Sequence, residues 1–199
     1  MQIIKMISKI ILVLASFVFC VQCQVPFLGT CPEVKVVQDF DITKYVGKWY
    51  EAERYFAVFQ FGGKCVTATY KLSHENSTSS IKVTNRQIGT ITGISTEIEG
   101  YAKLGNARST EGKLKVTFPS LPVDFDAPYW VLGTDYENFA VVWSCNDLGF
   151  LNTRNAWILT RQRKASVEIM KKAYAIIDEN KITRAYFIRT NQQSCPSQY

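Results

Sequence analysis

The stretch Gly47–Phe56, GKWYEAERYF, decides the fold of this chain. Side chains alternate along a β-strand, so one face of this segment would carry four residues: Trp49, Glu51, Glu53 and Tyr55. Two carboxylates beside two aromatic rings could form an acid/base pair in a cleft, or they could belong to a structural seam. The rest of the sequence has to separate these two interpretations.

The N-terminus has the pattern of a secretory signal peptide. Lys5 and Lys9 precede an apolar run over residues 10–19, which is too short to span a bilayer, and small residues follow before position 24. We expect residues 1–23 to be removed and residues 24–199 to form a single domain. This organisation predicts a secreted, extracellular protein.

The net charge excludes a typical nucleic-acid-binding surface. The chain has a net charge of +6, which falls to +4 when Lys5 and Lys9 leave with the expected signal peptide. The densest basic cluster, RQRK at 161–164, is short and has no interleaved aromatic residues. Phosphate binding needs a concentrated basic footprint, so we expect no nucleic-acid partner.

The cysteines of the mature chain predict two disulfides. Four remain after residue 23, namely Cys31, Cys65, Cys145 and Cys195, and the sequence alone allows three pairings. They show no CxxC spacing and the chain has one histidine, so no metal site is expected. The sequon NST in a polar segment predicts glycosylation of Asn76 on a surface loop.

Short β-branched and aromatic segments recur from Gly47 to about Gln162, separated by turn signals. We expect eight strands, at 48–56, 65–73, 80–88, 95–104, 113–118, 129–136, 139–145 and 155–162. Most separators are short enough for hairpins, so neighbouring strands should be antiparallel. Apolar residues at helical spacing in 165–181 then predict one amphipathic helix, and 184–190 predicts a short final strand.

These elements predict a mainly β fold: an eight-stranded up-and-down antiparallel barrel with one C-terminal α-helix and a short final strand. The interior of an eight-stranded barrel holds packed side chains or one small ligand.

Three motifs on these elements resemble the signatures of the lipocalin family. GKWYE at 47–51 resembles the first signature on the opening strand, and TDYEN at 134–138, with Thr134, Asp135 and Tyr136, resembles the second. Arg161 resembles the arginine that closes the last barrel strand. The wider match, in CPEVKVVQDFDITKYVGKWYE, APYWVLGTDYEN and NAWILTR, is most similar to the apolipoprotein D-like branch, which includes invertebrate bilin-binding proteins.

The resemblance implies several structural features. In this branch the first and third mature cysteines pair, as do the second and fourth, which implies Cys31–Cys145 and Cys65–Cys195. Trp49 would lie across the closed end of the barrel with the Arg161 guanidinium stacked on its indole, a cation–π contact. Gly47 would allow the close backbone approach beneath it.

Strand alternation and the resemblance together nominate a set of ligand-binding residues. In the branch, the positions that match Tyr70, Asn85, Tyr129 and Trp157 line the ligand cavity. The full candidate set adds three residues from the expected inward faces and comprises Tyr70, Asn85, Phe118, Tyr129, Val131, Trp143 and Trp157. A solid core made of the same residues is the alternative.

Catalysis is not expected. Glu51 and Glu53 approach from the same side of one strand, whereas a glycosidase-type pair faces across a substrate. We expect them in the polar, wider part of the barrel or outside it after a bulge. A free thiol at Cys65, which one lipocalin enzyme would suggest, is disfavoured by the even cysteine count.

The resemblance therefore implies a secreted carrier of a small hydrophobic ligand, such as a fatty acid, sterol or retinoid-like lipid. A bilin pigment carrier is the alternative, so the bound molecule would be a lipid or a tetrapyrrole rather than a catalytic cofactor. Loop aromatics such as Phe59 and Phe61 could touch a membrane or lipoprotein surface, or fold over the rim as a lid.

Overall fold

A computed structural model describes residues 25–56, 62–73, 80–106, 109–121, 126–197 and 199. Ten strands occur in this part of the chain: β1 Val25–Leu28, β2 Gly47–Tyr55, β3 Gly63–Ser73, β4 Ser80–Gly89, β5 Ser95–Leu104, β6 Lys113–Thr117, β7 Ala127–Thr134, β8 Phe139–Asp147, β9 Leu151–Thr160 and β10 Phe187–Arg189. The helical elements are α2 Ile42–Tyr45, α3 Val167–Glu179 and the 3₁₀ turn η3 Arg184–Tyr186.

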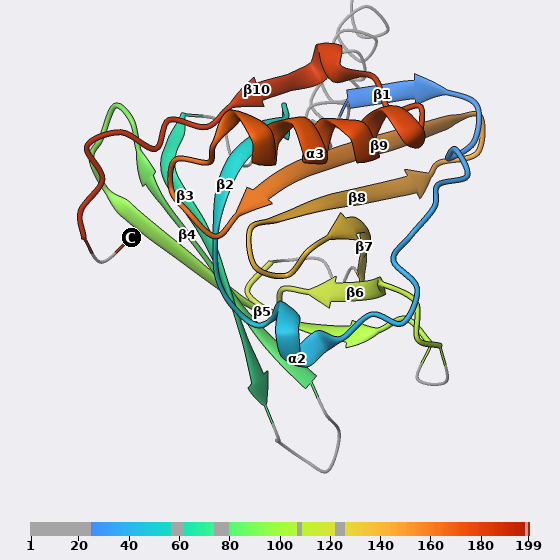
Figure 1. The fold of residues 1–199 in the computed structure, drawn as a ribbon, viewed down its shortest axis with the longest axis horizontal. Helices are drawn as coiled ribbons and strands as arrows, with labels where there is room; N and C mark the ends of the chain where they lie inside the picture. Colours follow the sequence, from blue (N-terminus) through green and yellow to red (C-terminus); the bar gives the residue numbers. More distant parts are fainter. Residues whose placement is uncertain (1–24, 57–61, 74–79, 107–108, 122–125, 198) are drawn as a thin grey trace, which may run out of the picture.

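Strands β2 to β9 form a closed antiparallel barrel in sequence order. Each strand pairs with the next, and β9 pairs with β2 to close the circle, while β1 adds to β9 and β10 adds to β2. Helix α3 packs against the outer face of β7 and β8 (Figure 1). The predicted mainly β barrel with one C-terminal helix and a final strand is therefore confirmed.

Several boundaries differ from the predicted ones. β9 begins at Leu151, four residues earlier than expected, because the polar segment LNTR is paired on both sides, with β8 and with β1. The final strand is shorter than expected, since residues 184–186 form a 3₁₀ turn whose Thr183 cap accepts a hydrogen bond from the Ala185 amide. The flanking strand β1 and the short helix α2 carry no strong sequence signal.

A bulge in β2 separates the two glutamates of the opening stretch. Glu51 pairs with Leu159 and Glu53 with Ile158, so Ala52 is an extra residue on β2. A bulge reverses the alternation of the residues that follow it. Glu51 therefore faces the barrel interior, whereas Glu53 faces outward, where both carboxylate oxygens accept from the Tyr174 hydroxyl of α3 at 2.8 Å.

Two apolar cores lie on either side of the barrel wall. The inner core fills the closed end and includes Tyr45, Trp49, Val131 and Val142. The outer core lies under α3 and includes Tyr55, Leu132, Phe139, Val141, Trp143, Ala173 and Ile177. β8 is buried on both faces. Its apolar run therefore has no polar side, and the sequence does not indicate which side chains face the barrel interior.

The C-terminal segment completes the wall between β2 and β3. Direct pairing of these strands stops at Tyr50 and Thr67. Beyond that point the Thr190 amide donates to Ala52 O at 3.0 Å, and the Cys65 amide donates to Asn191 O at 2.8 Å. The segment thus bridges β2 and β3 over the part of their length where they do not pair directly.

Two disulfides connect distant parts of the fold. Cys31 is bonded to Cys145 and Cys65 to Cys195, the pairing that the family resemblance implies. The second bridge anchors the C-terminal segment to the start of β3. Because Cys65 is bonded, it has no free thiol.

Candidate ligand-binding cavity

A cavity of about 520 Å³ occupies the barrel interior above the inner core. Its lining residues lie toward one end of the strands, for example Gln87 near the end of β4 and Thr96 near the start of β5. Asn146 near the end of β8 and Asn155 on β9 lie at the same end. The cavity therefore opens toward the turns that join β4 to β5 and β8 to β9.

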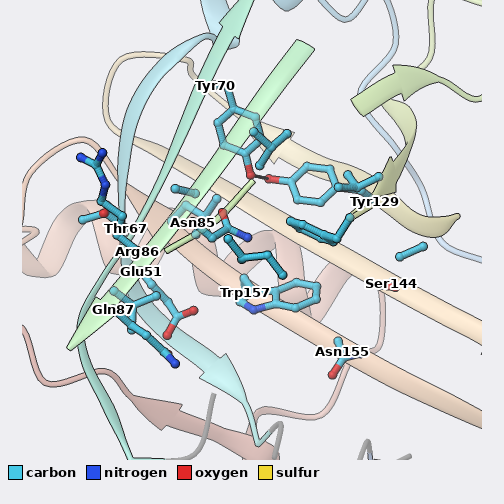
Figure 2. Close-up of a pocket in the computed structure, with 18 of the residues that line it drawn as sticks. Glu51, Thr67, Tyr70, Asn85, Arg86, Gln87, Tyr129, Ser144, Asn155 and Trp157 are labelled. Carbon is cyan, nitrogen blue, oxygen red and sulfur yellow. Dashed lines mark hydrogen bonds between the residues drawn. The ribbon is translucent and has the colours of Figure 1, made fainter. Parts of the chain in front are cut away.

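Five of the seven predicted ligand-binding residues line this cavity. They are Tyr70, Asn85, Phe118, Tyr129 and Trp157. Tyr70, Asn85, Tyr129 and Trp157 come from β3, β4, β7 and β9 and lie on several sides of the space (Figure 2), and Phe118 directly follows β6. The lining is mostly apolar and aromatic, with a few polar side chains, which is typical of small-molecule sites.

Two of the seven do not line the cavity. Val131 points into the barrel but is fully buried in the inner core below the cavity. The expected inward direction of Trp143 is wrong, because its ring lies in the outer core, 6.2 Å from the ring of Tyr55. Ser144 of the same strand lines the cavity instead. The two buried faces of β8 explain this error.

A trio of tyrosines lies at the bottom of the cavity, with Tyr70 and Tyr129 as its floor and Tyr45 beneath them. The Tyr129 hydroxyl lies 2.8 Å from the Tyr45 hydroxyl and 2.7 Å from the Tyr70 hydroxyl, and Figure 2 shows Tyr70 and Tyr129 meeting at their oxygens. Burial raises the pKa of all three phenols above the ordinary value of 10. They are therefore neutral at physiological pH and retain their hydrogens.

A buried ion pair lies on the cavity wall at Glu51. The Arg54 Nη1 atom donates to Glu51 Oε1 at 3.0 Å, and the Thr190 hydroxyl donates to the same oxygen at 2.5 Å. The side-chain Nε2 atom of Gln192 donates to the backbone oxygens of Glu51 and Val66. These contacts hold the C-terminal segment in the wall, and they give Glu51 a structural partner rather than a catalytic one.

The signature residues assemble at the closed end of the barrel. The Arg161 guanidinium lies 3.7 Å from the centre of the Trp49 ring, and Trp49 is fully buried. Gly47 has a φ of +102°, and a Cβ there would lie 3.0 Å from Arg161 Nη1. Asp135 accepts from the Asn138 and Phe139 amides and so fixes the β7–β8 turn, and these hydrogen bonds contribute to a lowered pKa of its carboxyl, against the opposing effect of burial.

Other expected features fall on residues that the structure does not describe. These are the signal peptide 1–23, the glycosylation site Asn76 and the rim aromatics Phe59 and Phe61, which lie outside the described residues. Within the described ranges, no cluster of three His, Cys, Asp or Glu side chains could hold a metal ion. No helix in those ranges is long and apolar enough to cross a membrane.

Comparison of the sequence and the structure with known proteins gives a family for this barrel. The sequence profile of the Lipocalin / cytosolic fatty-acid binding protein family matches residues 46–194. The chain belongs to the lipocalin family. This lipocalin is 37% identical to apolipoprotein D of Oryctolagus cuniculus over 187 residues, which cover 92% of the chain and 93% of that relative.

Two insect proteins extend the comparison of this lipocalin. It is 35% identical to the Lazarillo protein of Schistocerca americana, over 76% of the chain and 70% of that protein. The structure of insecticyanin from Manduca sexta superposes with a TM-score of 0.75 at 25% identity, over 84% of this chain and 89% of the other. The resemblance read from the sequence motifs is therefore confirmed.

Sequence reasoning did not select several residues that line the lipocalin cavity or lie beneath it. Asn155 belongs to a segment that was expected to begin a strand, but the outward or inward direction of its side chain depends on pairing across β8 and β9. Ser144 was missed because the wrong face of β8 was chosen. Tyr45 lies beneath the floor from α2, whose contact with the barrel no local pattern predicts.

Proposed function

We propose that this lipocalin is a secreted carrier that holds one small hydrophobic molecule, such as a fatty acid, sterol or retinoid-like lipid, in its barrel. The single observation that carries the proposal is the cavity of about 520 Å³, lined mainly by apolar and aromatic side chains, in a member of a carrier family. Burial of apolar ligand surface supplies the binding energy, roughly 25 cal/mol per Å² before ordering costs.

The residues that would contact the ligand are Tyr70, Asn85, Phe118, Tyr129 and Trp157. Trp157 supplies a large flat surface on the cavity wall (Figure 2). No chemical step is part of the proposal, because Glu51 is engaged by Arg54 and Thr190 and Cys65 is bonded to Cys195. The protein would bind, protect and release its ligand unchanged.

The carrier proposal is tested by native mass spectrometry of the protein purified from its source, followed by solvent extraction of the bound molecule. A mass excess that disappears on extraction, with a lipid in the extract, is the expected result. Titration of the extracted lipid into the ligand-depleted protein should then quench Trp fluorescence at a stoichiometry of one. Failure of every extracted or added hydrophobe to bind would contradict the proposal.

A bilin pigment carrier is the second candidate function. The similarity to insecticyanin and to the bilin-binding branch of the family favours it. A tetrapyrrole is flat and carries polar groups along its length, and such a shape suits a cavity with aromatic walls and polar side chains. A visible absorption band in the purified protein would decide for this function, and a colourless preparation with a bound lipid would decide against it.

The cavity mouth also suits transient contact with a lipid surface. Large apolar side chains are exposed on or next to the connections at the open end, namely Phe56, Ile91, Ile94, Leu121, Leu148 and Phe150. Ile91 is 94% exposed and Phe150 is 78% exposed, so neither is covered by the rim. We propose that this rim touches membranes or lipoprotein particles during ligand exchange.

Liposome flotation tests the rim contact. Ile91→Ser with Phe150→Ser should remove flotation of the protein with phosphatidylcholine vesicles. Leu104→Ser is the matched control, because Leu104 is an exposed leucine at the end of β5, away from the mouth. Equal flotation of the rim variant and the wild-type protein would contradict the contact.

Secretion itself is tested by N-terminal sequencing of the mature protein, which should begin at Gln24.

A further inference from the structure

Among the described residues, the hydrogen bonds of the tyrosine trio do not use all of its hydroxyl hydrogens. Tyr45, Tyr129 and Tyr70 carry three hydroxyl hydrogens, and the two hydrogen bonds among them use two. No other acceptor for these hydroxyls is recorded among the residues that the structure describes. One hydrogen is therefore left over, and its position depends on the direction of the two bonds.

Burial favours the bond direction that places this hydrogen in the cavity. Tyr70 and Tyr129 line the cavity, whereas Tyr45 lies beneath the floor and is only 1% exposed. If the bonds left the spare hydrogen on Tyr45, a donor would be buried without an acceptor, which is unfavourable. When Tyr45 donates to Tyr129, the spare hydrogen belongs to Tyr129 or Tyr70. The floor thus offers one donor to a ligand.

Two asparagine side chains on the walls are unsatisfied as well. The Oδ1 atoms of Asn85 and Asn155 are buried, and neither has a hydrogen-bond partner among the described residues. Both residues line the cavity, from β4 and β9, which are not neighbouring strands. An asparagine amide can accept through its oxygen or, after a half turn, donate through its nitrogen. Each wall therefore holds a buried amide oxygen that lacks a partner among the described residues.

We propose that this cavity selects amphiphiles that carry a hydroxyl or N–H group along their apolar body, in addition to an acceptor group at the end that reaches the tyrosine floor. The proposal rests on the carrier function proposed above and adds the chemistry of its ligand. Hydroxylated acyl chains, sterols with a ring hydroxyl and tetrapyrroles share this chemistry. A plain acyl chain has the end group only.

The sign of one affinity difference tests the proposal. Stearic acid and 12-hydroxystearic acid have the same length and differ by one hydroxyl in the middle of the chain. In a cavity without a polar partner, the hydroxyl would lose its hydrogen bonds to water without gaining another, and the hydroxy acid would bind more weakly than stearic acid. Paired with a buried amide, it should bind about ten-fold more tightly, the effect of one good hydrogen bond.

Variants of the asparagines assign the preference to the wall. Asn85→Leu or Asn155→Leu should weaken binding of the hydroxy acid more than binding of stearic acid and so remove the preference, and thermal unfolding checks that each variant folds. Asn146→Leu is the matched control, since Asn146 lines the cavity from β8 but, unlike Asn85 and Asn155, has no side-chain atom among the buried polar atoms without a partner. It should keep the preference. For the floor, octadecylamine, whose ammonium cannot accept a hydrogen bond, should bind at least ten-fold more weakly than stearic acid.

The outcomes separate this proposal from the carrier function. Equal or weaker binding of the hydroxy acid by the wild-type protein overturns the selectivity, as does a preference that survives both asparagine variants. Equal binding of octadecylamine overturns the acceptor requirement at the floor. Cholesterol and 7α-hydroxycholesterol repeat the comparison on a ring system and distinguish acyl from sterol ligands. If none of these molecules binds, the carrier function for lipids fails and the selectivity fails with it.

Discussion

The guanidinium of Arg161 stacks on the ring of Trp49 at 3.7 Å, and it joins the end of the last barrel strand to the first. Arg161 also donates to five backbone oxygens, those of Lys44, Tyr45, Val46, Lys48 and Tyr136. These carbonyls belong to α2, the start of β2 and the β7–β8 turn. One planar side chain therefore closes the barrel end that lies below the tyrosine floor.

Arg161→Lys should destabilise the protein by about 3 kcal/mol, because a lysine ammonium cannot reproduce the fork of donors or the stacking on Trp49. Trp49→Ala should cost a similar amount or more, since it removes a fully buried indole. Urea unfolding measures both. Ligand choice should change little in either variant. A change in ligand choice at undiminished stability would show that Trp49 and Arg161 are not structural residues of the closed end.

Two tryptophans provide a matched pair for the cavity. Trp157 lines it, whereas Trp143 lies outside the barrel wall under α3. Trp157→Phe should weaken ligand binding and abolish most of the fluorescence change that ligand produces. Trp143→Phe should lower the free energy of unfolding by about 1 kcal/mol and leave ligand affinity within two-fold of the wild-type value. The reverse pattern would place the binding site elsewhere.

The tyrosine trio predicts a loss of stability in alkali. In the unfolded chain a phenol ionises near pH 10, whereas burial raises the pKa of Tyr45 and Tyr70 in the folded protein. Above pH 10 the unfolded state therefore binds fewer protons than the folded state, and the free energy of unfolding falls as pH rises. One such phenol contributes a slope of about 1.4 kcal/mol per pH unit.

Urea midpoints measured from pH 8 to pH 11.5 check this slope. Stability from these phenols is fully present below pH 10 and is lost as pH rises toward their folded pKa values. Tyr70→Phe should show a shallower decline than the wild-type protein above pH 10. Tyr101→Phe serves as the control, because its ring lies on β5 away from the trio. An identical decline in wild type and Tyr70→Phe would count against a neutral, buried Tyr70.

The two disulfides should contribute similarly to stability but differently to ligand release. Their sequence separations are 114 and 130 residues, so restriction of the unfolded chain predicts nearly equal stabilisation, about 4–5 kcal/mol each. Only Cys65–Cys195 anchors the segment that bridges β2 and β3 beside Glu51. Cys65→Ser with Cys195→Ser should therefore speed ligand dissociation, whereas Cys31→Ser with Cys145→Ser should not.

Stopped-flow ligand release and amide hydrogen exchange measure the difference. The Thr190 amide, which donates to Ala52 O, should exchange faster only when the Cys65–Cys195 bridge is removed. Equal dissociation rates in the two double variants would show that the C-terminal segment stays in the wall without its covalent anchor.

The sequence by itself determined the barrel, its C-terminal helix and three residues of the closed end, Gly47, Trp49 and Arg161. Strand-length segments between turn signals and the three motifs are local patterns, and local patterns are readable along the chain. Five cavity residues could also be predicted, because strand alternation was combined with the family resemblance, which implied four of them. The same reasoning failed at Trp143, since both faces of β8 are buried and the sequence pattern there is symmetric.

Only the tertiary structure decided which way the side chains of the two glutamates in GKWYEAERYF point. A single extra residue, Ala52, turns Glu51 toward the cavity and Glu53 toward α3, and the partner strand β9 sets that register. Likewise, only the closed barrel brings Tyr45, Tyr70 and Tyr129 within hydrogen-bond distance of one another. Direction and contact depend on pairing between segments far apart in the chain, and such pairing leaves no local sequence signal.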